Sequence, residues 1–469
     1  MLNHADGAFA DRLSQAGIAV RTADPNYLEE PRGLFHGTAG FVALPRSTED
    51  VATIVGICGK ARVGLVPYGG GSGLVAGQIA LTPPATLILS LEKMDAIRAV
   101  YPSEDVIVVE AGVTVATVQD AAQEIGRLFP LSYASQDSAR IGGGLSVNSG
   151  GLNVVRYGMA RDACLGIEAV LPNGEILHGL KRLRKDNTGY DLRHLLIGAE
   201  GTLGIITAAA LKLFPLPHAV ATAFLSVPSP DAALSLLGIF RDQVGETVSA
   251  FELIPDQAFD FLAETHPDLK QPFSTPPRWS VLAEIGLGAG NDAEALMGRV
   301  FEAAVAADLV DDGVIAQSGQ QRGEFWSLRE TIPEANRRIG SIASHDISVP
   351  LSEIGDFIKD ASARISAIIP CRINAFGHLG DGNLHFNVFP EKGKTRADYA
   401  GKSGEVTRCL HDMVMARGGS FSAEHGIGRA KAEELQRYGD PAKLAAMRAI
   451  KTALDPDGIM NPGAVLPEA

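Results

Sequence analysis

Two histidines in the last third of the chain stand seven residues apart, on either side of a glycine-rich turn. They are His378 and His385, within the run NAFGHLGDGNLHFNV. A second short run, SAEHG, adds the carboxylate of Glu424 and the imidazole of His425. Two imidazoles and a carboxylate form a typical ligand set for a divalent metal, with zinc as the first candidate. If these side chains converge, the chain carries out metal-assisted chemistry.

The size, charge and cysteine content of the chain limit its domain number and the kinds of partner and site it can have. With 469 residues the chain exceeds one ordinary core, so about two to four packed units are expected. A net charge of −14 and a pI of about 5.3 argue against a nucleic-acid partner, which would favour a basic stripe. The four cysteines include no CxxC pair, so neither a disulfide framework nor a thiolate metal site is indicated.

The start of the sequence indicates the compartment. MLNHADGAFADRLSQAG lacks the basic and apolar regions of a secretory signal and the basic character of a transit peptide. No apolar run approaches the length that spans a bilayer. We therefore expect a cytoplasmic protein, with a peripheral membrane partner left open.

The elements that must position these residues follow two patterns. Residues 35–216 form a glycine-rich block in which short β-type runs such as TLILSL and VIVVE alternate with helices, one of them capped by Ser47. After a proline-rich exit near Pro215, strands and helices alternate again over 219–307. This second pattern predicts an α/β layer with a mostly antiparallel sheet and helices on one face.

Three glycine-rich segments in the first block are candidate ligand cradles. They are 66–74 (VPYGGGSGL), 141–151 (IGGGLSVNSGG) and 198–204 (GAEGTLG). Dense glycine lets successive backbone N–H groups turn inward around an anion. None of the segments completes a dinucleotide GxGxxG or a P-loop motif. Tight turns explain any single segment at least as well as ligand binding does, but three such segments together favour a large phosphate-bearing cofactor.

These motifs resemble a known flavoprotein family. VPYGGGSGL, IGGGLSVNSGGLNVVRYG and LIGAEGTLGIIT resemble the FAD-binding domain of the vanillyl-alcohol oxidase/p-cresol methylhydroxylase flavoproteins. GHLGDGNLHFN, AEHGIG and LDPDGIMNPG resemble its D-2-hydroxyacid dehydrogenase branch, which includes D-lactate, glycolate and D-2-hydroxyglutarate dehydrogenases. The resemblance implies an α+β fold, with a two-subdomain FAD-binding domain, an α/β cap domain with an antiparallel sheet and a C-terminal helical segment. The expected parts are an N-terminal helical segment at 1–34, the FAD domain at 35–217, the cap with the metal loop at 218–420, and a return to the FAD domain at 421–469.

The resemblance also implies which residues hold FAD. Residues 66–74 would receive the pyrophosphate, 142–150 would line the flavin and ribityl chain, and 156–158 would close over it. Residues 200–205 match adenine-side and ribityl contacts, and Asn461 matches a position near the flavin ring. The residues expected to contact FAD are Pro67, Gly69, Gly70, Gly71, Ser72, Gly73, Leu74, Gly142, Gly143, Ser146, Asn148, Gly150, Arg156, Tyr157, Gly158, Glu200, Gly201, Gly204, Ile205 and Asn461.

Several properties of the redox centre follow from the same resemblance. Some relatives carry FAD on a histidine near the glycine loop, but no histidine lies between His36 and His178 here. Noncovalent FAD is therefore expected. The electron acceptor is expected to be an electron-transfer flavoprotein, a cytochrome or a quinone, and a homodimer is a family-level expectation.

A chemical mechanism follows if a D-2-hydroxyacid is the substrate. In this branch the residues matching His378, His385 and Glu424 bind a divalent cation. Such an ion can chelate the substrate carboxylate and α-hydroxyl and lower the hydroxyl pKa. His425 is the first candidate for the base that takes the hydroxyl proton, with orientation of Glu424 as its alternative role.

Two further residues are expected at the substrate, and two positions depart from the D-2-hydroxyglutarate subgroup. Arg329 matches the carboxylate-binding arginine of the family, and Asn387 reaches the same pocket as His385 if that segment is a strand. Pro333 stands where the subgroup carries a threonine, and Ser344 where it tends to carry a lysine. A smaller or more hydrophobic D-2-hydroxyacid is therefore as well supported as D-2-hydroxyglutarate.

Two other functions remain open at this point. The same fold serves alkylglycerone-phosphate synthase-like transferases, in which the flavin forms a covalent adduct without net oxidation. A flavin-binding subunit without activity of its own is the other alternative. The H-x6-H and EHG motifs favour hydroxyacid oxidation over both.

Overall fold

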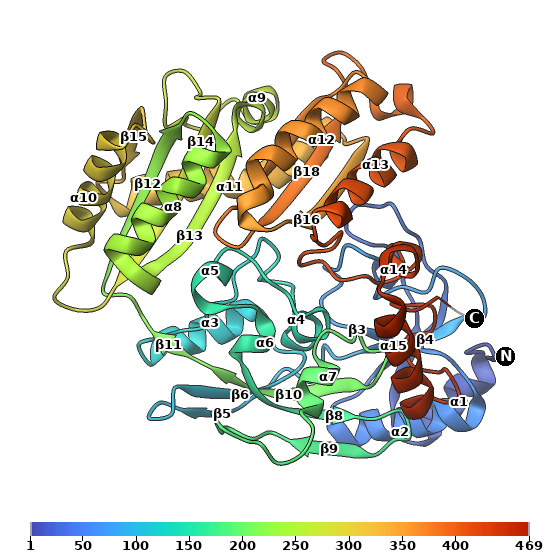
Figure 1. The fold of residues 1–469 in the computed structure, drawn as a ribbon. Helices are drawn as coiled ribbons and strands as arrows, with labels where there is room; N and C mark the ends of the chain where they lie inside the picture. Colours follow the sequence, from blue (N-terminus) through green and yellow to red (C-terminus); the bar gives the residue numbers. More distant parts are fainter. Residues whose placement is uncertain (1, 468–469) are drawn as a thin grey trace. The chain divides into compact units, whose positions relative to one another are not determined.

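The computed structural model describes residues 2–467, and the chain divides into two compact units (Figure 1). Unit 1 comprises Met1–Gly151, Gly158–Leu216 and Glu424–Ala469, and unit 2 comprises Leu152–Tyr157 and Pro217–Ala423. The chain thus passes between the units at 151/152, 157/158, 216/217 and 423/424, and the last two crossings lie beside the sequence-based boundaries after 217 and 420. Among the described helices, none combines the length and apolar character needed to cross a membrane.

The first sheet of unit 1 combines parallel and antiparallel pairs. Its strand order is β1-β2-β4-β3, with β2, β4 and β3 parallel and β1 antiparallel to β2. Its strands are β1 (Ala19–Thr22), β2 (Ala39–Leu44), β3 (Leu65–Tyr68) and β4 (Thr86–Ser90). Helices α1 (Gly7–Gln15) and α2 (Thr48–Ala61) pack against it through an apolar core. The Ser47 side chain accepts a hydrogen bond from the Asp50 backbone N–H and so caps α2, as the sequence predicted.

The second sheet of unit 1 is antiparallel, with strand order β5-β6-β10-β8-β9. Its strands are β5 (Ile97–Tyr101), β6 (Val106–Glu110), β8 (Cys164–Val170), β9 (Ile176–Gly179) and β10 (Ile205–Lys212), and β7 (Arg127–Leu128) pairs separately with β11 (Phe214–Pro215). The remaining helices of unit 1 are α3 (Val115–Glu124), α4 (Ile141–Val147), α6 (Ala160–Ala163), α7 (Leu192–Leu196), α14 (Ala432–Tyr438) and α15 (Pro441–Leu454), with a 3-10 turn η1 (Pro25–Tyr27).

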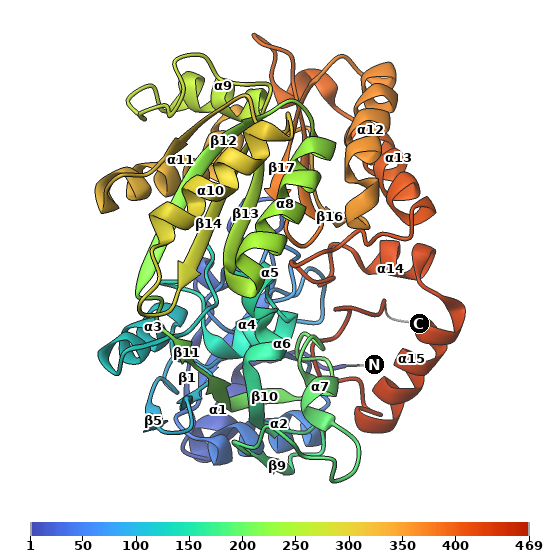
Figure 2. The ribbon, with the colours of Figure 1, turned by 60° about the vertical axis from the view of Figure 1, so that its left-hand side comes forward.

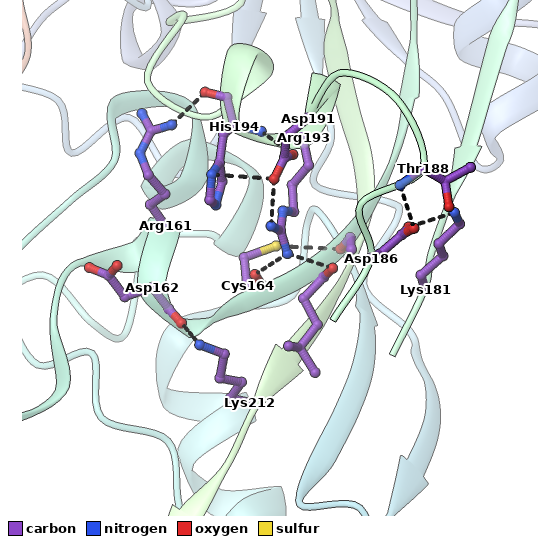
Figure 3. Close-up of polar contacts among 12 residues, drawn as sticks. Arg161, Asp162, Cys164, Lys181, Asp186, Thr188, Asp191, Arg193, His194 and Lys212 are labelled. Atoms are coloured by element: carbon purple, nitrogen blue, oxygen red, sulfur yellow. Dashed lines mark hydrogen bonds and ion pairs between the residues drawn. The ribbon is translucent and has the colours of Figure 1, made fainter. Parts of the chain in front are cut away.

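A cluster of arginine contacts fixes α7 against β8, just before the third glycine-rich segment (Figure 3). The Arg193 guanidinium donates to the Cys164 and Leu165 carbonyls at 3.0 and 2.7 Å and pairs with Asp191 at 2.8 Å. The Arg161 guanidinium donates to the Ile197 carbonyl at 2.6 Å. These contacts anchor the backbone at the residue before Gly198, so the start of segment 198–204 has a fixed position.

Unit 2 is built on one antiparallel sheet whose strand order is β15-β12-β14-β13-β17-β18-β16. Its strands are β12 (Ala219–Val227), β13 (Val248–Pro255), β14 (Trp279–Leu287), β15 (Asp312–Ile315), β16 (Ala343–Ser348), β17 (Arg372–His378) and β18 (Asn383–Phe389). Its helices are α5 (Val154–Tyr157), α8 (Pro230–Val244), α9 (Asp256–Thr265), α10 (Ala293–Ala306), α11 (Gly319–Ile339), α12 (Ile354–Ile368) and α13 (Ser403–Ala416), with 3-10 turns η2 (Gly245–Thr247), η3 (Leu351–Glu353) and η4 (Arg396–Tyr399). The antiparallel sheet was expected from the sequence.

Helices cover both faces of this sheet, so the expectation of helices on one face was wrong (Figures 1 and 2). Ala223 and Leu225 of β12 belong to the core formed with α8, α10, α12 and α13. Phe224, between them, belongs to the core formed with α9 and α11. Successive side chains of a strand point to opposite faces, so two buried faces give a continuous apolar run without alternation. The strands over 219–307 were predicted correctly, but their sequences did not reveal the second helical layer.

Phe224 offers a test of this second layer. It is fully buried, and its ring meets those of Phe259, Phe273 and Phe325 at centroid distances of 5.9, 5.7 and 5.6 Å. We expect Phe224→Ala to lower the stability of unit 2 by about 3–5 kcal/mol, because it leaves a cavity among three aromatic rings.

Tryptophan fluorescence during urea unfolding measures this loss, because both tryptophans of the chain, Trp279 and Trp326, lie in unit 2. Val305→Ala on the exposed side of α10 is the control, with an expected change within about 0.5 kcal/mol. An unchanged unfolding midpoint in Phe224→Ala would contradict the packing of α9 and α11 on this face.

Candidate functional site

The two histidines that opened the sequence analysis lie on one β-hairpin of unit 2. His378 is the last residue of β17 and His385 lies on β18, and their ring centroids are 5.3 Å apart at an interplanar angle of 81°. A ring nitrogen of each comes within 4.8 Å of the other. Gly377, before His378, has φ of +147°, and a Cβ there would lie 2.7 Å from the Asn383 carbonyl oxygen. The hairpin therefore brings the imidazoles together because glycine permits this close backbone approach.

A buried carboxylate holds His378 in place. Glu252 lies on β13, directly opposite His378 of β17 in the strand register, and its side chain is fully buried. His378 Nδ1 donates to Glu252 Oε1 at 2.7 Å. Because an ionised carboxylate only accepts hydrogen bonds, Nδ1 carries a proton, and in the neutral imidazole Nε2 then carries the ring lone pair. A carboxylate that orients a histidine in this way is a common companion of a metal-ligating imidazole.

Arg329 completes the ion pair of Glu252. From α11, its Nε and Nη2 approach Glu252 Oε2 at 2.7 and 2.6 Å, and the guanidinium lies 4.9 Å from the centroid of the Phe376 ring. Burial alone would raise the pKa of Glu252, but the Arg329 charge, the His378 imidazole and the hydrogen bonds from both lower the pKa to about 2. The carboxylate is thus ionised across the neutral pH range.

Sequence reasoning did not single out Glu252. The signal was present, because VSAFELIP places one acid in the middle of a strand whose residues are all buried. A buried carboxylate requires a charged or hydrogen-bonding partner. The sequence does not identify the partners, because both are far from Glu252 along the chain. His378 follows it by 126 residues on β17, and Arg329 follows it by 77 residues on α11.

Asn387 lies in the same sheet as His385, two residues further along β18, as expected if that segment is a strand. It is buried, and its register neighbours are Asn374 on β17 and Ser344 on β16. Asn374 Nδ2 donates to Asn336 Oδ1 on α11 at 3.0 Å, whereas the buried Asn374 Oδ1 has no hydrogen-bond partner among the described residues. This part of the sheet is lined by neutral amides and a hydroxyl.

Glu424 and His425 stand where the chain enters the last segment of unit 1, whereas His378 and His385 belong to unit 2. The Glu424 carboxylate and His425 Nε2 are 3.8 Å apart, and both side chains are half-buried. On the unit 2 side of this junction, the Ala423 backbone N–H donates to the Asp346 carbonyl at 3.3 Å. The chain that leads to Glu424 is therefore attached to β16.

The three glycine-rich segments meet in unit 1, which the sequence alone did not establish. Segment 66–74 continues from β3, and a Cβ on its Gly70 would lie 1.8 Å from the Ser138 carbonyl oxygen. A Cβ on Gly69 would lie 3.4 Å from the Gly143 Cα in the second segment. Gly70 therefore has to be glycine to pass the backbone of Ser138, just before the second segment, and Gly69 is in van der Waals contact with the backbone of that segment.

The third segment contacts the other two. A Cβ on Gly201 would lie 2.3 Å from Pro67 Cγ in the first segment, and one on Gly198 would lie 3.5 Å from the Asn148 Cβ in the second. The backbone N–H of Glu200 donates to the Ser146 carbonyl at 2.8 Å. Three glycine-rich segments, the second of which begins with helix α4, thus converge, an arrangement that suits a phosphate-bearing cofactor.

Glu200 and Asn461 connect this cradle to the C-terminal segment. The Glu200 carboxylate accepts from the Ile427 and Gly428 backbone N–H groups, both at 2.7 Å, and Asn461 Nδ2 donates to the Glu200 carbonyl at 2.7 Å. Burial raises the pKa of Glu200 against the effect of these hydrogen bonds. Within the described chain, both side chains therefore join backbone segments of unit 1, whatever contact they make with a cofactor.

The remaining expected FAD residues divide between the units. Arg156 and Tyr157 form part of α5 in unit 2, where Arg156 Nη1 donates to the Gly286 carbonyl at 2.8 Å and the guanidinium lies 5.0 Å from the Tyr157 ring centroid. The others lie in unit 1 within or next to the converging segments: Gly71, Ser72, Gly73, Leu74, Gly142, Gly150, Gly158, Gly204 and Ile205.

Comparison with known proteins shows that the chain contains an FAD-binding domain. Residues 39–179 match the family described as FAD binding domain, and residues 216–465 match FAD linked oxidases, C-terminal domain. The chain is 36% identical over 448 residues to the mitochondrial D-2-hydroxyglutarate dehydrogenase of Bos taurus, covering 95% of this chain and 80% of the relative. It is 36% identical to the D-2-hydroxyglutarate dehydrogenase of Xanthomonas citri pv. viticola, covering 90% of this chain and 88% of the relative.

Solved structures show the same fold at lower identity. A p-cresol methylhydroxylase with bound substrate matches with a TM-score of 0.76 at 16% identity, over 98% of both chains. An alkyldihydroxyacetonephosphate synthase matches with a TM-score of 0.73 at 19% identity, over 98% of this chain and 85% of that one. The expected p-cresol methylhydroxylase type of fold is confirmed.

Gly70 allows the FAD cradle to be tested. We expect Gly70→Ala to weaken FAD binding about tenfold or more. The new Cβ meets the Ser138 carbonyl, so the segment must move, and that movement costs about 1–3 kcal/mol. FAD content per protein and the FAD dissociation constant of the apoprotein, measured by flavin absorbance, report this loss.

Gly56→Ala is the matched control. Gly56 lies inside α2, and a Cβ there meets no atom within 4 Å. This substitution should leave FAD binding unchanged and stabilise the helix by about 0.5–1 kcal/mol. Normal FAD affinity in Gly70→Ala would show that the close approach of Gly70 to Ser138 does not shape the cofactor site.

Proposed function

The chain belongs to the family of FAD-linked D-2-hydroxyglutarate dehydrogenases, and on that premise we propose that a divalent metal assists its oxidation of a D-2-hydroxyacid to the 2-oxoacid. The observation that carries the redox class is the 36% identity to such dehydrogenases over nearly the whole chain. Bound FAD supplies the hydride acceptor, flavin N5. The substrate loses its Cα hydrogen as hydride and its hydroxyl proton to a base, so two electrons and two protons leave in all.

His378, His385 and Glu424 would hold the divalent ion, with zinc as the first candidate. The oriented His378, with its Nε2 lone pair, and the neighbouring His385 fit such an ion. Glu424 follows Ala423 directly, and Ala423 is hydrogen-bonded to Asp346, the register partner of His385. That continuity supports Glu424 as the third ligand. A bound ion would supply Lewis-acid polarisation of the substrate hydroxyl.

The remaining side chains would orient the substrate and move its proton. Arg329 uses its side-on edge, Nε and Nη2, for Glu252, which leaves the end-on edge of the guanidinium to meet the substrate carboxylate. Asn387 would donate to or accept from the same substrate. His425 would take the hydroxyl proton, since an imidazole suits proton transfer near neutral pH.

The choice of hydroxyacid is a separate proposal. D-2-Hydroxyglutarate is the first candidate because the relatives carry its name. Pro333 and Ser344 are both exposed, and Ser344 Oγ donates to Ser341 Oγ at 2.7 Å beside the amide of Asn387. Pro333 and Ser344 themselves bring no positive charge to a distal substrate carboxylate, which supports D-lactate or another small D-2-hydroxyacid as the second candidate.

The electron acceptor, the oligomeric state and the cellular compartment of the protein are further proposals. An electron-transfer flavoprotein, a cytochrome or a quinone would reoxidise the flavin, and a homodimer is expected at family level. The names of the Bos taurus and Arabidopsis thaliana relatives place those proteins in the mitochondrion, whereas those of two bacterial relatives give no compartment. The cytoplasmic location stays a prediction.

The alternative functions have weaker support. The likeness to an alkyldihydroxyacetonephosphate synthase lies at 19% identity and concerns the fold alone. Relatives at 34–36% identity are dehydrogenases by name. The transferases share a histidine-rich active site, but the H-x6-H and EHG motifs fit a metal site for hydroxyacid oxidation better.

Anaerobic mixing with candidate substrates tests the redox reaction. We expect D-2-hydroxyglutarate or D-lactate to bleach the flavin stoichiometrically, because hydride transfer to N5 yields the reduced form. Flavin absorbance is the measurement, D-malate and bulkier D-2-hydroxyacids complete the series, and the L-enantiomers are controls. Dithionite marks full reduction. A flavin that dithionite bleaches but no D-2-hydroxyacid reduces would rule out the proposed reaction.

Removal of a ligand tests the metal. We expect His378→Ala to lose bound metal and nearly all turnover while it keeps FAD, because the metal site and the FAD cradle are built from different segments. His425→Ala should keep the metal and slow flavin reduction by about 10²–10⁴-fold, the usual effect of a general base. Elemental analysis and anaerobic stopped-flow absorbance provide the two measurements.

His178→Ala serves as the control for both variants, since this histidine lies on β9 of unit 1 with a side chain 74% exposed. It should keep wild-type metal content and rate. Full activity in a metal-free His378→Ala protein would refute metal assistance while leaving the flavin chemistry intact.

A further inference from the structure

One carboxylate in unit 2 contacts two groups of different proposed roles. Glu252 Oε1 accepts from His378 Nδ1 at 2.7 Å, and Glu252 Oε2 accepts from Arg329 Nε at 2.7 Å. The side chain of Glu252 is 0% exposed, and those of its partners are 7% and 5% exposed. The three groups come from three elements, β13, β17 and α11. Each oxygen thus serves one partner, away from water.

A second pair on the same sheet shows what a purely structural contact looks like. Glu284 on β14 accepts from Arg322 Nε at 2.9 Å, from Trp326 Nε1 at 2.8 Å and from Thr222 Oγ1 at 2.8 Å. Arg322 precedes Arg329 by seven residues, or about two turns, on the same helix. The two arginines therefore attach one face of α11 to neighbouring strands. Among the described residues, the side chains that donate to the Glu284 carboxylate belong to Thr222, Ser249, Arg322 and Trp326 and include no histidine, and the Arg322 side chain is 42% exposed.

We propose that Glu252 is a positioning residue that couples the metal ligand His378 to the carboxylate anchor Arg329. This inference rests on the proposed function, which assigns those two roles. The carboxylate fixes the protonated nitrogen and the ring direction of His378, and so presents Nε2 as the ligand atom. The same carboxylate holds the side-on edge of Arg329 and so aims its end-on edge. Metal affinity and substrate affinity therefore depend on one side chain that touches neither ligand.

If Glu252 couples the two groups, replacing Glu252 and replacing Arg329 should have different effects on metal binding. Loss of Glu252 removes the support of both His378 and Arg329. Loss of Arg329 leaves the hydrogen bond between Glu252 and His378 in place. We expect Glu252→Gln to bind metal 10–100-fold more weakly, the usual effect of removing such a support, and to raise KM at saturating metal. Arg329→Met should raise KM while it keeps the metal affinity of the wild type.

Titration of the metal-free, FAD-loaded protein with Co²⁺ provides the readout apart from activity. The Co²⁺ absorption bands report both affinity and ligand geometry, and KM and kcat are measured separately at saturating metal. Glu284→Gln is the matched control, because it removes the same charge from the other carboxylate that holds α11. It should leave Co²⁺ affinity and spectrum unchanged.

Stability is checked in parallel, since removing one partner of a buried ion pair leaves the other charge unpaired and destabilises the protein. Tryptophan fluorescence reports the folding of unit 2 in each variant. If Glu252→Gln does not fold, Glu252→Asp keeps the charge but is one methylene too short to reach both partners, so it should still weaken Co²⁺ binding and raise KM. Wild-type Co²⁺ affinity and KM in whichever folded variant is used would overturn the proposal.

The outcome for the wild type separates this inference from the proposed function. If the wild type binds no Co²⁺ and His378→Ala changes nothing, the metal assignment itself is wrong. If the wild type binds Co²⁺ through His378 but Glu252→Gln binds it equally well, only the coupling fails. Equal weakening in Glu284→Gln would also overturn the coupling, because the effect would then come from the attachment of α11.

Discussion

The Glu252 carboxylate constrains the geometry of unit 2 more than any apolar contact does. A buried ionised carboxylate is unfavourable unless charged donors surround it at hydrogen-bond distance. Here the donors are Arg329 and His378, at 2.6–2.7 Å. Apolar side chains can shift by fractions of an ångström and still exclude water, whereas these hydrogen bonds fail over the same displacement. The relative positions of β13, β17 and α11 are therefore set by one polar group within an otherwise apolar core.

That constraint explains why a helix must cover the second face of the sheet. Side chains at 252 and 284 point to the face that carries Phe224 and Leu282, and α11 supplies an arginine to each carboxylate. An uncovered face would expose the pairs to water, where surface ion pairs contribute about 0–1 kcal/mol. With α11 in place, the carboxylates gain fixed partners and the helix gains a fixed register. Packing and charge pairing thus require the same arrangement.

The sequence predicted the local features well and the long-range pairings poorly. The cap at Ser47, the strand TLILS and the hairpin that carries His378 and His385 follow from residue patterns a few positions long. The contact between Glu252 and His378 spans 126 residues and depends on β17 joining the sheet beside β13, which no local pattern encodes. The second helical layer was missed because a strand buried on both faces shows no alternation.

The glycine-rich segments also form long-range contacts that their local sequence did not reveal. Their composition indicated a cofactor, but it was read as freedom for backbone donors to turn inward. In unit 1 the glycines also let loops touch each other: Gly70 approaches Ser138, and Gly201 approaches Pro67, at distances that exclude a Cβ. Glycine at these positions is therefore required by loop-to-loop contact before any cofactor binds. If FAD binds at these three segments, it meets a site whose backbone contacts are already made, so little of the binding free energy is lost in ordering the chain.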